Sequence, residues 1–196
     1  DWSSDVCSSD LLALSPDDLY VLYTGGTTGM PKGVLWRQND IYLNAMGGRI
    51  FGSTDQVASL DRIVDRAKLG GGGSLTCAPL MHGAAQWSAF SCMLAGRPCV
   101  MSSVTSHFDP VEVWELAARE RVAMILIVGD AFARPLADAL EANPGRWDLS
   151  ALVTIGSGGG RIKTGIHVAA PGDPVADVPD KLIAAALEFA IGKIGR

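Results

Sequence analysis

The chain has 196 residues, 48% of them hydrophobic, and carries a formal net charge of −5 at pH 7. The acidic balance argues against a nucleic-acid-binding surface, and no block of like charges indicates an interaction tail. No apolar stretch approaches the length of a membrane-spanning helix, and a secretory signal is not expected because no basic residue precedes Lys32.

The first 14 residues give no apolar periodicity. Serine and aspartate are frequent between Asp1 and Asp10, so this stretch has no face that a core would bury. We expect residues 1–14 to be a non-native or disordered leader that contacts little of the core.

A loop rich in glycine and threonine follows the apolar run from Leu19 to Tyr23, which predicts a short buried strand. Glycines let backbone N–H groups turn toward an anion, threonine hydroxyls add donors, and a lysine supplies a mobile positive charge. The loop is not a Walker A motif, because Lys32 is followed by Gly33 and a second predicted strand instead of Ser or Thr opening a helix. A glycine-rich hairpin remains the alternative. The candidate phosphate ligands are Thr24, Gly25, Gly26, Thr27, Thr28, Gly29 and Lys32.

Beyond the loop, predicted helices and strands alternate. This alternation predicts an α/β fold in which helices flank a partial, mostly parallel sheet, with ligands at the carboxyl ends of the strands. The expected helices are 37–46, 83–94, one that begins after Asp109, and 130–141; the expected strands are 75–79, 99–101, 124–128 and 152–155.

The helix after Asp109 has the clearest start signal. Asp109 is a natural N-cap, Pro110 suits the first helical position, and Glu112 stands where a capping box requires a glutamate. The continuous apolar run from Met124 to Val128 then predicts a strand that is covered on both faces.

Two further features are weak evidence for a functional site when each is taken alone. His82 stands at a predicted strand-to-helix junction, where the commoner fate of a solitary histidine is to be satisfied by the backbone. The glycine turn that contains Gly156, Ser157, Gly158 and Gly159 follows the last predicted strand and is equally consistent with an ordinary turn.

Together these segments resemble the adenylate-forming (AMP-binding) superfamily, which includes acyl-CoA synthetases, peptide-synthetase adenylation domains and luciferases. Residues 24–33 resemble its phosphate-binding signature, with Gly26 where a serine or threonine is common. The stretch Ala78-Pro79-Leu80-Met81-His82-Gly83 resembles its second core motif, which implies that His82 lines the acyl pocket. The resemblance implies that Gly156, Ser157, Gly158 and Gly159 lie on the adenine and acyl side, with Gly160 in place of the usual alanine.

The resemblance is closest to bacterial fatty-acyl-CoA synthetases. It implies an acid–thiol ligase that converts a carboxylate and ATP into acyl-AMP and pyrophosphate, and then transfers the acyl group to CoA. The implied cofactors are ATP, Mg²⁺ and CoA, and the implied substrate is a fatty acid. A catalytically inert nucleotide-binding fragment, and a fragment of a peptide-synthetase domain or luciferase-like enzyme, remain alternatives.

The resemblance covers about residues 15–159, and we expect residues 15–160 to form part of the AMP-binding N-terminal domain. The family's Tyr-Gly-x-Thr-Glu and Thr-Gly-Asp motifs and its C-terminal catalytic lysine are not visible in the sequence. We therefore assign no catalytic residue and no metal ligand, and expect the chain to be an inactive fragment when alone. Residues 161–196 are expected to form a divergent tail, out of frame or chimeric.

Four cysteines, Cys7, Cys77, Cys92 and Cys99, show no C-x-x-C pairing and no histidine partners at zinc-finger spacing. Apolar surroundings favour buried reduced thiols, and hence a reducing compartment. We expect a cytoplasmic protein.

Overall fold

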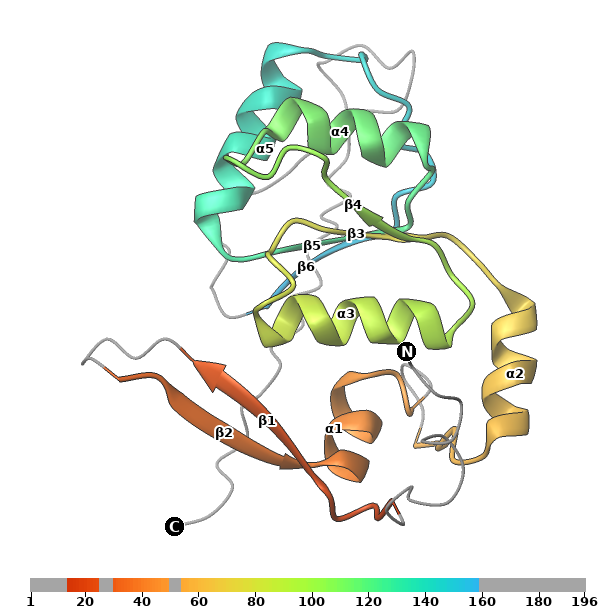
Figure 1. The fold of residues 1–196 in the computed structure, drawn as a ribbon. Helices are drawn as coiled ribbons and strands as arrows, with labels where there is room; N and C mark the ends of the chain where they lie inside the picture. Colours follow the sequence, from red (N-terminus) through yellow and green to blue (C-terminus); the bar gives the residue numbers. More distant parts are fainter. Residues whose placement is uncertain (1–13, 25–29, 50–53, 159–196) are drawn as a thin grey trace, which may run out of the picture.

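The computed structural model describes residues 14–24, 30–49 and 54–158 (Figure 1). The predicted α/β class is confirmed, with helices on both sides of a parallel sheet. The predictions for the leader and the tail concern residues outside these ranges, apart from Leu14. In chain order the elements are β1 (Leu19–Thr24), β2 (Lys32–Arg37), α1 (Gln38–Ala45), α2 (Leu60–Leu69), β3 (Ser74–Thr76), α3 (Gly83–Leu94), β4 (Cys99–Met101), α4 (Pro110–Arg119), β5 (Met124–Ile127), α5 (Asp130–Ala142) and β6 (Thr154–Ser157).

The main sheet has the strand order β4-β3-β5-β6, and every neighbouring pair is parallel. Parallel strands need crossover connections, and α3, α4 and α5 are positioned in sequence to provide them. Figure 1 shows α4 and α5 on one side of this sheet and α3 on the other. The carboxyl ends of β3, β5 and β6 therefore meet at one edge, close to where α3 and α5 begin.

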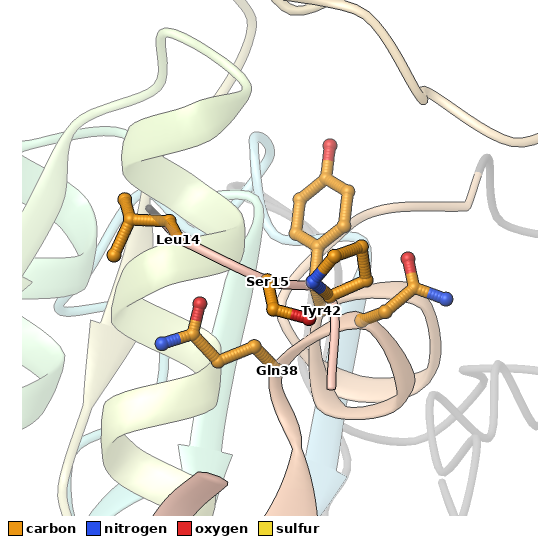
Figure 2. Close-up of a pocket in the computed structure, with 6 residues that line it drawn as sticks. Leu14, Ser15, Gln38 and Tyr42 are labelled. Carbon is orange, nitrogen blue, oxygen red and sulfur yellow. The ribbon is translucent and has the colours of Figure 1, made fainter. Parts of the chain in front are cut away.

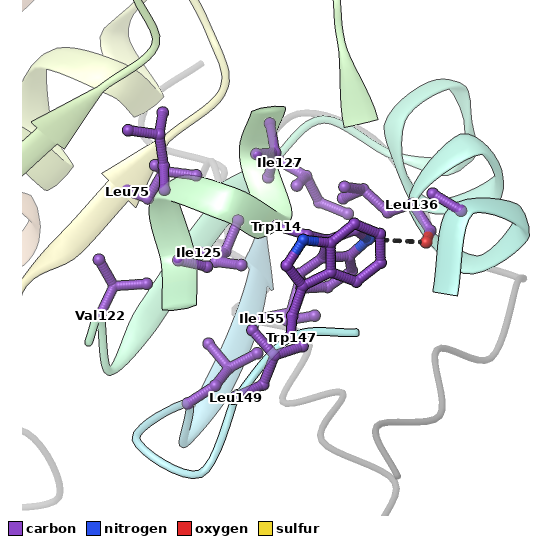
Figure 3. Close-up of a cluster of buried hydrophobic side chains, with 14 of the residues drawn as sticks. Leu75, Trp114, Val122, Ile125, Ile127, Leu136, Trp147, Leu149 and Ile155 are labelled. Carbon is purple, nitrogen blue, oxygen red and sulfur yellow. Dashed lines mark hydrogen bonds between the residues drawn. The ribbon is translucent and has the colours of Figure 1, made fainter. Parts of the chain in front are cut away.

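The main core lies between the sheet and the α4/α5 layer (Figure 3). Trp114 is fully buried there, and its indole Nε1 donates a hydrogen bond to the carbonyl oxygen of Leu136 at 2.9 Å. Strand β5 is buried on both of its faces, as its continuous apolar run predicts: Ile125, Leu126 and Ile127 are at most 2% exposed.

Helix α4 begins as predicted, with Pro110 at its first position. The carboxylate oxygen Oδ1 of Asp109 accepts hydrogen bonds from the backbone N–H groups of Val111 at 2.9 Å and Glu112 at 3.2 Å. One half of the predicted capping box is formed, since Asp109 accepts from the N–H of Glu112. The Glu112 carboxylate instead accepts from the hydroxyl of Ser102 and from the backbone and hydroxyl of Ser103, which ties the loop after β4 to the helix.

Strands β1 and β2 form a separate antiparallel hairpin, in which Leu19 pairs with Arg37 at the base and Thr24 pairs with Lys32 at the tip. The prediction that Leu19–Tyr23 is a buried strand is wrong for one of its faces. Leu19, Val21 and Tyr23 are 57%, 43% and 69% exposed.

Some elements differ from the sequence prediction in presence or in length. Helix α2 was not expected; the hydroxyl of Ser59 caps it by accepting from Arg62 N, and Gly70 ends it with a φ of 60°. Strand β3 is shorter than predicted. Strand β6 begins at Thr154 rather than Leu152, so Gly156 and Ser157 lie in the strand and not in a glycine turn.

No helix in the described ranges is long and apolar enough to cross a membrane.

Candidate functional site

The hairpin tip carries the two ends of the predicted phosphate loop. Thr24 and Lys32 are opposite each other in the β1–β2 ladder, and Lys32 is exposed. Directly paired residues of an antiparallel ladder have Cα atoms only about 5 Å apart, so the loop starts and ends at one point. Gly25, Gly26, Thr27, Thr28 and Gly29 lie outside the described residues.

One face of the hairpin is anchored to the first turns of α3. The Tyr20 hydroxyl and the Gln86 amide oxygen form a hydrogen bond between the two elements. The rings of Trp36 and Trp87 meet edge to face, with centroids 6.1 Å apart and an interplanar angle of 78°.

Gly83 permits this docking because it has no side chain. A Cβ atom at Gly83 would lie 2.5 Å from a methyl carbon of Leu22 and 2.9 Å from the indole of Trp87. The close approach of β1 to α3 therefore requires glycine, or a shift of the hairpin, at this position.

His82 precedes α3 as its N-cap residue, in an extended conformation with φ −98° and ψ 142°. Its backbone N–H donates to Pro79 O at 3.0 Å, and its carbonyl accepts from Gln86 N at 3.1 Å. The side chain does not cap the helix and is exposed. The backbone of His82 is thus engaged while its imidazole is exposed.

The predicted adenine-side segment reaches the same helix from the sheet. Gly158 donates its N–H to Ile127 O at 3.0 Å, and a Cβ atom there would lie 2.7 Å from the Cβ of Ala84. Ser157 is buried, and its hydroxyl accepts a hydrogen bond from Gly129 N at 2.9 Å, at the start of α5. Gly156 pairs with Leu126, and Gly159 lies outside the described residues.

Three segments that are far apart in the sequence therefore converge on the first turns of α3. The hairpin packs on Gly83, Gln86 and Trp87, Gly158 packs on Ala84, and His82 is the residue directly before the helix. This place is at the carboxyl edge of the parallel sheet, where ligands bind in open α/β folds. A helix amino terminus also favours anions.

Sequence reasoning missed the residues that dock the hairpin: Tyr20, Trp36, Gln86 and Trp87. Gln86 and Trp87 are three and four residues after Gly83, so helical periodicity places them on the face of α3 that Gly83 occupies. That spacing predicts which face of α3 these residues share, but not what packs against it. Their partners, Tyr20 and Trp36, are more than 50 residues away in the sequence.

An open surface depression of about 340 Å³ lies elsewhere, at the base of the hairpin (Figure 2). Tyr42 on its wall donates a hydrogen bond to Val57 O at 2.6 Å, and burial raises the pKa of this phenol. None of the predicted site residues lines it. The lining residues are Leu14, Ser15, Pro16, Gln38, Asn39 and Tyr42.

Cys77 directly follows β3, close to the carboxyl edge of the sheet. Burial raises the pKa of its thiol to about 12, so it is a poor nucleophile at neutral pH. Among the residues that the structure describes, no group of three or more histidine, cysteine, aspartate or glutamate side chains is placed to hold a metal ion.

Comparison with solved structures supports the fold. The O-succinylbenzoate coenzyme A synthetase of Bacillus subtilis, determined in complex with AMP, superposes with a TM-score of 0.52 at 26% identity, over 74% of this chain and 26% of that one. An N-terminal domain of FACL13 from Mycobacterium tuberculosis superposes with a TM-score of 0.54 at 23% identity, over 76% of this chain and 32% of that one.

Curated relatives are more similar in sequence. The medium-chain acyl-CoA ligase Mig of Mycobacterium avium is 49% identical over 145 residues, which is 74% of this chain and 26% of that ligase. The 3-oxocholest-4-en-26-oate–CoA ligase of Rhodococcus rhodochrous is 40% identical over 148 residues, or 73% of this chain and 26% of that ligase. The chain thus spans about a quarter of the length of these relatives. The family model described as AMP-binding enzyme matches residues 4–170, and the chain belongs to this family.

Proposed function

We propose that the chain forms part of an AMP-forming acyl-CoA synthetase. The enzyme joins a carboxylate to ATP, releases pyrophosphate, and transfers the acyl group from acyl-AMP to CoA. The observation that carries this proposal is the convergence of the hairpin and Gly158 on the first turns of α3, which His82 directly precedes. The names of the relatives, which are CoA ligases, agree with it.

In this proposal, the hairpin tip binds the phosphates of ATP. Attack of a carboxylate on the α-phosphorus needs the leaving pyrophosphate to be neutralised and held in line, so positioning and electrostatics dominate. Lys32 supplies a cation at an exposed tip, and residues 24–29 supply hydroxyls and backbone N–H groups. Lys32 therefore binds phosphate and is not assigned the part of a catalytic lysine.

His82 and the segment from Gly156 to Gly159 serve the acyl chain and the adenine. His82 suits a pocket wall because its backbone is fixed at the start of α3 while its imidazole is exposed. Gly158 suits close approach because it packs directly against Ala84. The Ser157 hydroxyl accepts a hydrogen bond from Gly129 N, so we propose that Ser157 positions this segment.

A fatty acid is the proposed carboxylate. Names of the relatives include medium-chain acyl-CoA ligase and medium/long-chain-fatty-acid–CoA ligase. Mg²⁺ would accompany the ATP phosphates and CoA would accept the acyl group. The described residues include no donor set that fits a metal ion on its own, so we assign neither partner to a particular side chain.

A chimeric enzyme tests this function. The matching stretch of the Mycobacterium avium ligase is replaced with residues 14–158 of this chain, and carboxylate-dependent exchange of labelled pyrophosphate into ATP is measured. We expect exchange with medium-chain fatty acids. A folded chimera that exchanges only with amino acids would place the chain with peptide-synthetase domains, and one inactive with every carboxylate would contradict the proposal.

A further inference from the structure

The face of the hairpin that docks on α3 is also the face that carries Lys32. Alternate residues of a strand share a face, so Trp36 and Lys32, four positions apart, lie on one side of β2. Tyr20 is paired directly opposite Trp36 and lies on the same side. That side meets the helix, because Tyr20 is hydrogen-bonded to Gln86 and Trp36 packs on Trp87. The hairpin therefore presents Lys32 on the side where α3 lies.

The orientation of the hairpin depends on what it packs against. Within the described residues, β1 and β2 pair only with each other, and an isolated two-stranded hairpin is marginally stable at best. A hydrogen bond from Gln38 N to Asp18 O, at 2.8 Å, holds the base, just beyond the last pair of the ladder. Helix α3 contacts the hairpin nearer its tip, at Tyr20, Leu22 and Trp36.

The contacts with α3 differ in what they constrain. The contact of Leu22 with Gly83 sets how closely β1 approaches the helix, but the attraction between apolar groups has no preferred direction. The hydrogen bond from the Tyr20 hydroxyl to the Gln86 amide oxygen does have one, because such a bond weakens steeply as it bends. This hydrogen bond is therefore the contact that fixes the tilt of the hairpin on α3.

Small tilts are amplified at Lys32. Four residues of a strand span about 13 Å, so a tilt of about 5° at Trp36 moves the backbone of Lys32 by about 1 Å. A misplacement of about 1 Å can cost roughly 100-fold in rate when it moves a group that acts on the reacting atoms.

We propose that Tyr20 and Gln86 are positioning residues for the phosphates of ATP. Their hydrogen bond holds the hairpin at the tilt from which Lys32 reaches the phosphates, and neither side chain touches the nucleotide itself. The inference rests on the proposed function, in which Lys32 binds these phosphates.

The test measures ATP binding and ATP use separately in the chimera with the Mycobacterium avium ligase. For Tyr20→Phe, isothermal titration calorimetry with ATP and Mg²⁺, without fatty acid, gives the Kd, and pyrophosphate exchange gives KM for ATP and for the fatty acid. We expect Kd and KM for ATP to rise roughly 3- to 10-fold, as for the loss of one hydrogen bond, with KM for the fatty acid unchanged. A merely structural role would reduce the amount of active protein and leave these constants unchanged.

Tyr23→Phe is the matched control, because it removes the same hydroxyl from the opposite face of β1, where Tyr23 is 69% exposed. It should leave the Kd for ATP unchanged. Gln86→Met removes the acceptor at similar volume and should reproduce the effect of Tyr20→Phe, so it also serves if Tyr20→Phe does not fold. Gln86→Glu keeps an oxygen acceptor and should retain the wild-type Kd.

The outcomes separate this inference from the function on which it rests. An unaltered chimera that neither binds ATP nor catalyses exchange would overturn the proposed function and this inference with it. An active chimera in which Tyr20→Phe and Gln86→Met leave the Kd for ATP unchanged would overturn the positioning role alone. So would additive losses in the double variant, or an equal rise in KM for ATP and for the fatty acid.

Discussion

The Glu112 side chain gives the structure a pH-sensitive contact at the start of α4. Hydrogen bonds from Ser102, and from the hydroxyl and backbone of Ser103, lower its pKa from the ordinary value of 4.5. A carboxyl whose folded-state pKa is depressed stabilises the fold above its unfolded-state pKa, and this stabilisation is lost as the pH falls through the folded-state value.

Glu112→Gln should therefore lower the free energy of unfolding at pH 7 by about 1 kcal/mol, a value reduced for solvent screening at this partly exposed site. The difference in unfolding free energy between wild type and variant should narrow as the pH falls from 6 toward 3. Urea unfolding at several pH values measures it, with Glu141→Gln, on the exposed side of α5, as the control. A gap that is independent of pH would show that the charge of Glu112 is not the cause.

At the scale of single residues, the sequence predicts contacts between residues that are close together in the chain. Asp109 and Pro110 start α4 as expected because a cap involves only the next three residues. The side-chain partners of Glu112 are nine and ten residues away, in a loop whose path depends on the sheet, so local sequence could not predict them.

At the scale of elements, the contact of β6 with α3 depends on two small residues. Replacing Gly158 with alanine places a Cβ atom 2.7 Å from the Cβ of Ala84, in a backbone that cannot easily retreat because Gly158 N is bonded to Ile127 O. Such overpacking costs about 1–3 kcal/mol.

Gly158→Ala should lower the unfolding free energy by that amount, and adding Ala84→Gly should restore part of it. A double-mutant cycle by urea unfolding gives the coupling energy. Additive effects of the two substitutions would mean that Gly158 and Ala84 do not form the contact described here.

The docking of the hairpin on α3 is a second element-scale contact. Tyr20→Phe removes the hydroxyl that bonds Gln86 and should cost about 1 kcal/mol. The loss should vanish in a Gln86→Met background, because the acceptor is then absent. Urea unfolding of the four proteins measures this, and an equal loss in both backgrounds would assign the effect to something other than this hydrogen bond.

Whether a segment forms a helix or a strand was more predictable than which other segment it packs against. The strand within the apolar run Met124–Val128 and the helices 83–94 and 130–141 were predicted from the local sequence alone. Helix α2 was missed although Leu60, Ile63, Val64 and Ala67 recur at helical spacing, and none of its residues is buried in the structure. The one-sided hairpin was mistaken for a buried strand because its sequence is apolar on both faces.

At the scale of the whole molecule, the fold class and the two strands that flank the predicted phosphate loop were predictable, whereas the way the hairpin docks on α3 was not. Alternating strands and helices indicate a parallel sheet, and the sheet fixes the edge at which ligands bind. That α3 gathers the hairpin, His82 and Gly158 at one end depends on contacts such as Trp36 with Trp87, which join residues far apart in the sequence.

In the proposed function, the hairpin tip binds the ATP phosphates and His82 lines the pocket for the fatty acid. Steady-state pyrophosphate exchange by the chimera, with Lys32→Ala and His82→Ala compared with a Lys68→Ala control, tests it most directly. Lys32→Ala should reduce kcat/KM for ATP by roughly 10- to 100-fold, as expected for a lost charge-assisted contact. His82→Ala should mainly raise KM for the fatty acid. If Lys32→Ala left the ATP kinetics equal to those of Lys68→Ala in a folded chimera, the phosphate site would not be at the hairpin tip.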